Sequence, residues 1–81
     1  MQQLVNTSTQ VGAIISARRK ALGISQQELA SKIGISQSRL SILEADAAAM
    51  PLERLVVLLK LLGLELVIRD KTEGPSSKAQ W

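Results

Sequence analysis

The feature that most constrains this chain is a pair of helix-start signals on either side of a very short connection. Ser25-Gln26-Gln27-Glu28 has the capping-box pattern, in which the Ser hydroxyl accepts from a first-turn amide and the Glu carboxylate returns to the Ser amide. Gly34 can adopt the positive φ that ends a helix, and Ser36 can cap the next one. The pattern predicts a helix over 26–33, a tight turn, and a second helix that ends near Glu44.

Helical periodicity continues on both sides of this pair. A capping pattern over 7–10, followed by apolar residues at helical spacing, predicts a helix over 8–22. A loop over 45–50 then leads to Pro51, which favours the first turn of a further helix, and to an apolar run that Gly63 ends. Because the chain has one aromatic residue, its core must consist of Leu, Ile, Val and Ala, which favours closely packed helices. We therefore expect an all-α fold of four to five short helices.

The pattern changes after Gly63, where residues 64–69 alternate at strand period. A lone strand has no ladder partner in its own subunit, so we expect it to pair with the same strand of a second copy. The preceding helix is apolar on more than one face, which also favours a dimer. We predict a homodimer whose interface contains Leu58, Leu62, Leu64, Leu66, Val67 and Ile68. Residues 1–69 would form one domain, and 70–81 a flexible tail.

Composition excludes several classes of site. Without cysteine or histidine, the chain can form neither disulfides nor the usual zinc sites, and no convergent set of polar residues suggests an enzyme. We expect no cofactor. The net charge of +3 permits a polyanionic partner without identifying one. No apolar stretch could span a bilayer, and the first residues lack the pattern of a secretory signal, so we expect a cytoplasmic, nucleoid-associated protein without membrane contact.

The second helix of the pair has side chains that can contact DNA. Leu40 and Leu43 would face the core with Ile42 partly buried, leaving the start of the helix exposed. We expect base contacts there, because Gln can bond adenine through two hydrogen bonds and Arg can bond guanine. The predicted base-contacting residues are Gln37, Ser38 and Arg39. The predicted phosphate-contacting or supporting residues are Gln26, Gln27, Ser36, Ser41, Arg18 and Arg19. For the last two, simple complementation of the helix dipole stays an open alternative.

These spaced elements resemble the lambda-repressor-like (Cro/C1, XRE) helix-turn-helix family over about residues 8–63. The matching residues are Gly23-Ile24-Ser25-Gln26-Gln27-Glu28-Leu29-Ala30, Gly34-Ile35-Ser36-Gln37 and Glu44. The resemblance implies a dimer that places two copies of the second helix in successive major grooves of operator DNA. It also implies that Gln26 contacts phosphate and braces Gln37. Asp46 departs from the family pattern, which often has Gly there, although Asp tolerates left-handed geometry.

The Leu64-Glu65-Leu66 segment and the polar tail that ends in Trp81 are further similar to HipB-type antitoxins of bacterial toxin–antitoxin operons. That likeness implies an antitoxin that represses its own operon and neutralises a HipA-type serine/threonine kinase toxin. Trp81, the sole aromatic residue, could anchor the tail in a partner pocket, or could have no role at all. Two alternatives stay open: a stand-alone XRE-family repressor without a toxin, and a protein-interaction module that no longer binds DNA.

Overall fold

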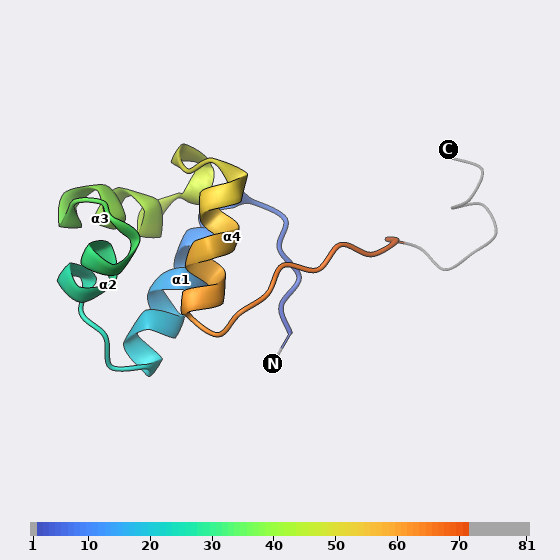
Figure 1. The fold of residues 1–81 in the computed structure, drawn as a ribbon. Coiled ribbons are helices and arrows are strands. Elements are labelled where there is room, and N and C mark those ends of the chain that lie inside the picture. Colours follow the sequence, from blue (N-terminus) through green and yellow to red (C-terminus); the bar gives the residue numbers. More distant parts are fainter. Residues whose placement is uncertain (1, 72–81) are drawn as a thin grey trace.

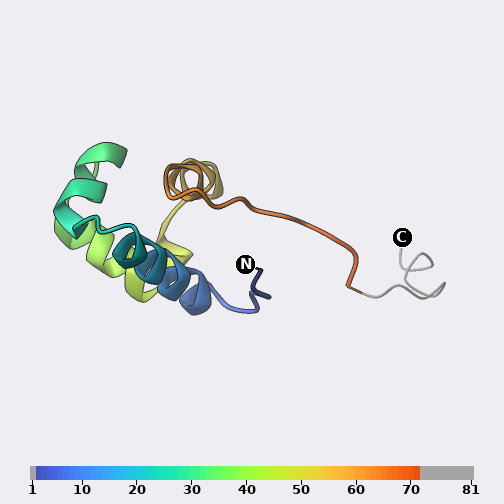
Figure 2. The ribbon, with the colours of Figure 1, turned by 90° about the horizontal axis from the view of Figure 1, so that it is seen from below.

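A computed structural model describes residues 2–71 of the chain. Its elements are α1 (Ser8–Ala21), α2 (Gln26–Ile33), α3 (Gln37–Ala45), the short 3-10 helix η1 (Ala47–Ala49) and α4 (Leu52–Leu61). Figure 1 shows α2 and α3 together at one end of the molecule, and Figure 2 shows α1 and α3 side by side with α4 seen nearly end-on. The predicted all-α body of four to five short helices is confirmed, with four α-helices within residues 2–71. No helix within residues 2–71 has the length and hydrophobicity needed to cross a membrane.

Local capping fixes where the helices begin. The Thr7 hydroxyl accepts from the Gln10 amide at 3.2 Å, and the Gln10 side chain returns to the Thr7 amide at 3.1 Å. The Ser25 hydroxyl and the Glu28 carboxylate form the same reciprocal pair at 3.0 and 3.2 Å. Ser36 accepts from the backbone of α3 at 3.1 Å. Each predicted cap is present, so the helix starts follow from interactions that span only three residues.

Each of the four α-helices contributes to one hydrophobic core. Ile15, Leu29, Leu40, Leu58 and Leu62 are each at most 1% exposed, and the cluster is entirely aliphatic. This packing corrects part of the predicted dimer interface. Leu58 and Leu62 are fully buried inside their own subunit, so they have no surface to offer a second copy. The prediction failed there because periodicity alone does not indicate which side of a helix that is apolar all round faces inward.

The segment after α4 leaves the helical body. Leu64 is half-buried and its amide donates to the Leu59 carbonyl at 2.8 Å, which closes the end of α4. Beyond it the chain extends away from the helices (Figures 1 and 2), and Leu66, Val67 and Ile68 are 49%, 66% and 90% exposed. No strand occurs among the described residues, so the predicted strand over 64–69 is not confirmed. A strand needs a ladder partner, and residues 2–71 of one subunit supply none.

A close helix contact at Gly12 sets the position of α3. A Cβ at residue 12 would lie 2.6 Å from the carbonyl oxygen of Glu44 and 2.7 Å from that of Leu43. Both atoms belong to the backbone of α3 and cannot move independently of the helix. Only glycine lets α1 approach α3 this closely.

Gly12→Ala should therefore lower the free energy of unfolding by about 1–3 kcal/mol, because α3 must shift to admit the methyl group. Urea denaturation measures the loss, and NMR shifts at Leu43 and Glu44 report the displacement. The control is Gly23→Ala, where φ is +72° and no atom lies within 4 Å of an added Cβ, so its cost is backbone strain without movement of α3. A Gly12→Ala protein more stable than wild type, as helix propensity alone would give, would contradict this account.

Candidate nucleic-acid interface

The turn between α2 and α3 holds the two helices at a fixed angle. Gly34 adopts φ +76°, and this left-handed residue lets the Ile35 amide return to the Ala30 carbonyl at 3.0 Å. Ile35 packs half-buried against the core, and Ser36 immediately caps α3. The connection is therefore rigid, and the orientation of α3 relative to α2 follows from backbone geometry.

The exposed face of α3 contains the predicted base-contacting residues. Gln37, Ser38, Arg39 and Ser41 are all exposed, while Leu40 faces the core and is fully buried. The Ser38 hydroxyl lies 3.3 Å from that of Ser36, the cap residue. Among residues 2–71, α3 thus presents four polar side chains on its solvent-exposed surface. Such a face fits the major groove of DNA, which is wide enough to admit one α-helix.

A buried carboxylate connects this face to the rest of the domain. The Arg19 Nε atom donates to Glu44 Oε2 at 2.7 Å, and Arg19 Nη2 donates to Glu44 Oε1 at 3.2 Å, so the pair is bidentate. The Gln26 amide also donates to Glu44 Oε1 at 3.0 Å. The Arg19 and Glu44 side chains are only 10% and 6% exposed. Through Glu44, the end of α3 is bound to both α1 and the start of α2.

The ionisation of Glu44 reflects two opposing effects. Burial raises the pKa of the Glu44 carboxyl, while hydrogen bonds from Arg19 and Gln26 and the charge of Arg19 lower it. The lowering effects are jointly larger, so the pKa lies below its ordinary value of 4.5. Glu44 is therefore an anion at neutral pH, and the ion pair with Arg19 is intact there.

Comparison with known families identifies this arrangement. A helix-turn-helix family model matches residues 15–68, which include α2, the turn, α3 and α4. The chain belongs to the XRE-type helix-turn-helix family. A comparison with curated proteins finds no match.

Solved structures agree with the family. A chain in a structure titled "Structure of HipA-HipB-O2-O3 complex" is 30% identical, superposes with a TM-score of 0.75, and is matched over 88% of this chain and 100% of its own length. A chain in a HipB-O1-O2 complex is also 30% identical, with a TM-score of 0.73 over 85% of this chain and 100% of its own. Over 85–88% of its length, this chain is thus similar in fold to chains from two solved complexes that contain HipB.

Several predicted supporting residues of this helix-turn-helix lie elsewhere than expected. Arg19 is 8% exposed, and its guanidinium donates to Glu44 and, through Nη1 at 2.9 Å, to the Ile24 carbonyl, so little of it is accessible to a phosphate. Arg18 is half-buried, and its Nε atom donates to the Leu62 carbonyl at 2.8 Å, which closes the end of α4. Each arginine thus makes hydrogen bonds that hold α1 to another part of the domain, Arg19 to α3 and Arg18 to the end of α4. Of the two roles predicted for Arg19, the burial and the pairing with Glu44 support the supporting role and not the phosphate contact.

The first helix of the pair also differs from the expected arrangement. The Gln26 amide donates to Glu44, and no hydrogen bond from Gln26 to Gln37 occurs within the described residues. Gln27 is exposed beside it at the start of α2. The role of Glu44 as the shared acceptor for Arg19 and Gln26 was not predicted from the sequence. The spacing of Ile15 and Arg19, four residues apart on one face of α1, was the available signal, because it places an arginine on a buried stripe that needs an anionic partner.

The loop after α3 does not need a glycine at position 46. Asp46 adopts an extended φ of −159°, and its carboxylate accepts from the Ala48 amide at 2.9 Å, which caps η1. Hydrogen bonds from Ser8 and from that amide hold the pKa of Asp46 below its ordinary value of 3.8. Asp46 therefore does not adopt the left-handed geometry considered for this position. It is instead the N-cap of the short 3-10 helix that begins at the next residue.

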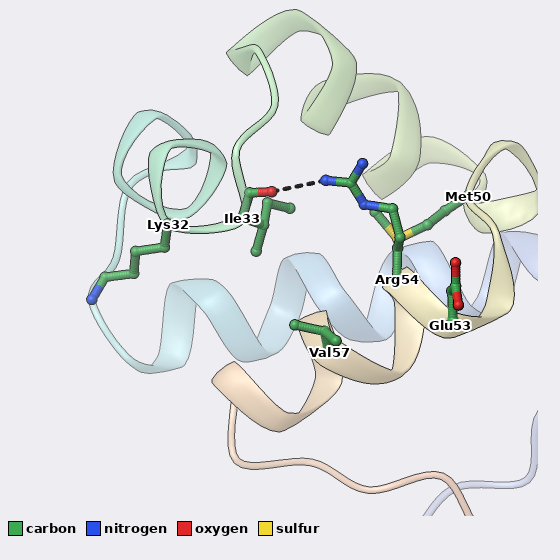
Figure 3. Close-up of a pocket in the computed structure, with 6 residues that line it drawn as sticks. All are labelled: Lys32, Ile33, Met50, Glu53, Arg54 and Val57. Carbon is green, nitrogen blue, oxygen red and sulfur yellow. Dashed lines mark hydrogen bonds between the residues drawn. The ribbon is translucent and has the colours of Figure 1, made fainter.

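An open surface pocket lies between α2 and α4, away from the exposed face of α3. Its volume is about 370 Å³, and none of the predicted DNA-contacting residues lines it. Figure 3 shows its six lining residues: Lys32, Ile33, Met50, Glu53, Arg54 and Val57. Arg54 Nη2 donates to the Ile33 carbonyl at 3.0 Å across the pocket. The guanidinium thus binds the carbonyl end of α2 to α4 and helps to fix α2 in place.

Proposed function

We propose that this protein is a HipB-type antitoxin, a non-enzymatic homodimer that binds operator DNA in the cytoplasm, represses its own operon and neutralises a HipA-type kinase toxin. The observation that carries the DNA part is the polar, exposed face of α3 on a rigid helix-turn-helix whose core is complete. The likeness to chains of a HipA-HipB-O2-O3 complex and of a HipB-O1-O2 complex supports the operon and toxin parts.

In the DNA complex, α3 enters the major groove by its N-terminal end. Gln37 and Arg39 contact base edges or the adjacent backbone, and Ser38 and Ser41 complete the polar surface. Gln27 and the amides at the start of α2 lie against phosphate, where the positive end of the helix dipole favours an anion. The ion pair at Glu44 keeps α3 and α2 in one orientation, so these contacts require no rearrangement on binding.

The dimer surface that we propose is revised from the sequence prediction. Val57 and Leu61 are 55% and 46% exposed, lie one turn apart on α4, and replace Leu58 and Leu62. Leu66, Val67 and Ile68 continue this apolar surface beyond α4. Burying these side chains against a second copy removes their apolar area from water and supplies the ladder partner that the 64–69 segment lacks. Leu64 contributes chiefly to its own subunit.

Gln37→Ala should weaken operator binding by about 1–3 kcal/mol and relax the base preference at one position of each half-site, because it removes a base-edge contact. Electrophoretic shift of the DNA upstream of the gene, titrated against salt, measures both effects. The slope with salt should stay unchanged, since no phosphate contact is lost. Gln2→Ala, at an exposed position outside the helices, is the matched control. Equal losses on operator and random DNA would contradict a base contact by Gln37.

The toxin assignment has a separate test. Trp81, the proposed tail anchor, lies outside the described residues, so its contribution rests on the sequence alone. Copurification with a kinase-like protein encoded by a neighbouring gene, with the full chain and with residues 72–81 removed, tests it. A stand-alone repressor would bind the same operator and would retain no kinase in either form.

A further inference from the structure

An isoleucine on the outer side of α3 lies outside the hydrophobic core of residues 2–71. Ile42 is 60% exposed, although the sequence pattern predicted partial burial. It follows Leu40 by two residues, which is about 200° around a helix, so its side chain points away from the core. Ser38 precedes it by four residues and lies on the same face. Ile42 therefore continues the polar face of Gln37, Ser38 and Ser41 by one apolar side chain.

We propose that Ile42 determines operator specificity by packing against the 5-methyl group of a thymine in the major groove. The inference rests on the proposed DNA function and deepens it. Thymine is the base that presents an apolar group on the major-groove edge, and an aliphatic side chain selects it by contact instead of by hydrogen bonding. Hydrogen bonds from the polar residues of α3 do not detect this methyl group. Ile42 thus adds a thymine requirement to the preference set by Gln37 and Arg39.

The position of Ile42 separates it from the proposed dimer surface. The exposed apolar residues of that surface belong to α4 and to the segment after it, including Val57, Leu61 and Ile68. Leu40 and Leu43 on α3 are directed toward the core that α4 completes, whereas Ile42 is on the opposite side of α3. A second copy bound through α4 leaves Ile42 exposed. Its side chain would be buried only by a ligand that binds the outer face of α3.

The test begins with operator sites that the wild-type full chain selects from random-sequence DNA. Each thymine in a selected half-site is then replaced by deoxyuridine, which removes only the 5-methyl group. Wild-type affinity should fall about 3- to 10-fold at one position, the effect of exposing a buried methyl contact. Ile42→Ala should show a similar loss on the thymine site and no further loss on the deoxyuridine site. Its melting temperature should match wild type because the side chain is largely exposed.

The controls separate the possible failures. Leu4→Ala removes a comparable exposed aliphatic side chain, 74% exposed in the segment before α1, and should keep the full thymine dependence. If wild type selects a sequence yet tolerates deoxyuridine at every position, or selects no thymine, the role of Ile42 is overturned while DNA binding stands. If Ile42→Ala keeps the deoxyuridine penalty, another residue contacts the methyl group and the inference is also overturned. If selection from random-sequence DNA with the wild-type chain enriches no sequence, the proposed function itself is overturned.

Discussion

Glu44→Ala should lower the free energy of unfolding by about 3–5 kcal/mol, because it leaves the buried Arg19 guanidinium without its anion. The Arg19–Glu44 pair is bidentate, with side chains only 10% and 6% exposed, and Gln26 would also lose its acceptor. Small domains are stable by about 5–15 kcal/mol, so the loss is a large share of the total. Urea denaturation at pH 7 measures it.

Two variants show whether the charge pair itself is responsible. Glu53→Ala removes an exposed glutamate from the first turn of α4 and should cost less than about 1 kcal/mol. The double variant Arg19→Met with Glu44→Leu removes both charges and should recover much of the stability, because replacing a buried pair by apolar groups is often neutral. A double variant as unstable as Glu44→Ala would show that shape and not charge governs this contact.

The same pair makes stability depend on pH in a definite direction. The folded pKa of Glu44 lies below the ordinary value of 4.5, so the ionised carboxylate stabilises the fold fully above that value. This contribution decreases as the pH falls through the folded pKa. Wild type should therefore lose more stability below pH 4.5 than the double variant does. Denaturation midpoints between pH 3 and pH 7 compare the two proteins, and parallel curves would count against a lowered pKa.

A chain carrying Val67→Asp and Ile68→Asp should lose dimerisation and bind a two-half-site operator about 10²- to 10⁴-fold more weakly. Both side chains are largely exposed in the described subunit, so the substitutions leave its core intact. Placing four carboxylates together across the two-fold axis would oppose pairing by like-charge repulsion. A monomer binds only one half-site, so it loses the gain in affinity that a dimer has from binding both half-sites at once. Sedimentation equilibrium and operator titration measure the two effects.

Substitutions that add the same negative charge elsewhere test whether the effect is specific to the proposed dimer surface. Gln2→Asp with Thr9→Asp adds the same two carboxylates at exposed positions before and at the start of α1, and should leave the protein dimeric. Affinity for a single half-site should be equal in all three proteins, because α3 is unchanged. A dimer that persists in the Val67→Asp and Ile68→Asp chain would place the interface outside the segment after α4.

Much of the fold and part of the candidate site follow from signals that act within a few residues. The capping boxes at Thr7 and Ser25, the cap at Ser36 and the left-handed Gly34 lie where the sequence places them, because each depends on neighbours three or four positions away. The exposure of Ser38 follows equally, since it precedes the inward-facing Leu40 by two residues, which is about 200° around the helix. The family resemblance, which rests on these same local elements, is confirmed for that reason.

Tertiary packing decided the remainder. The sequence determined that α4 is apolar on several faces, but only the packed helices show that Leu58 and Leu62 face inward while Val57 and Leu61 face outward. It likewise determined that α1 ends in basic residues, yet the pairing of Arg19 with a carboxylate 25 positions away required the fold. Local hydrogen bonds specify where helices begin and turn, whereas the partner of a side chain depends on which distant surfaces meet.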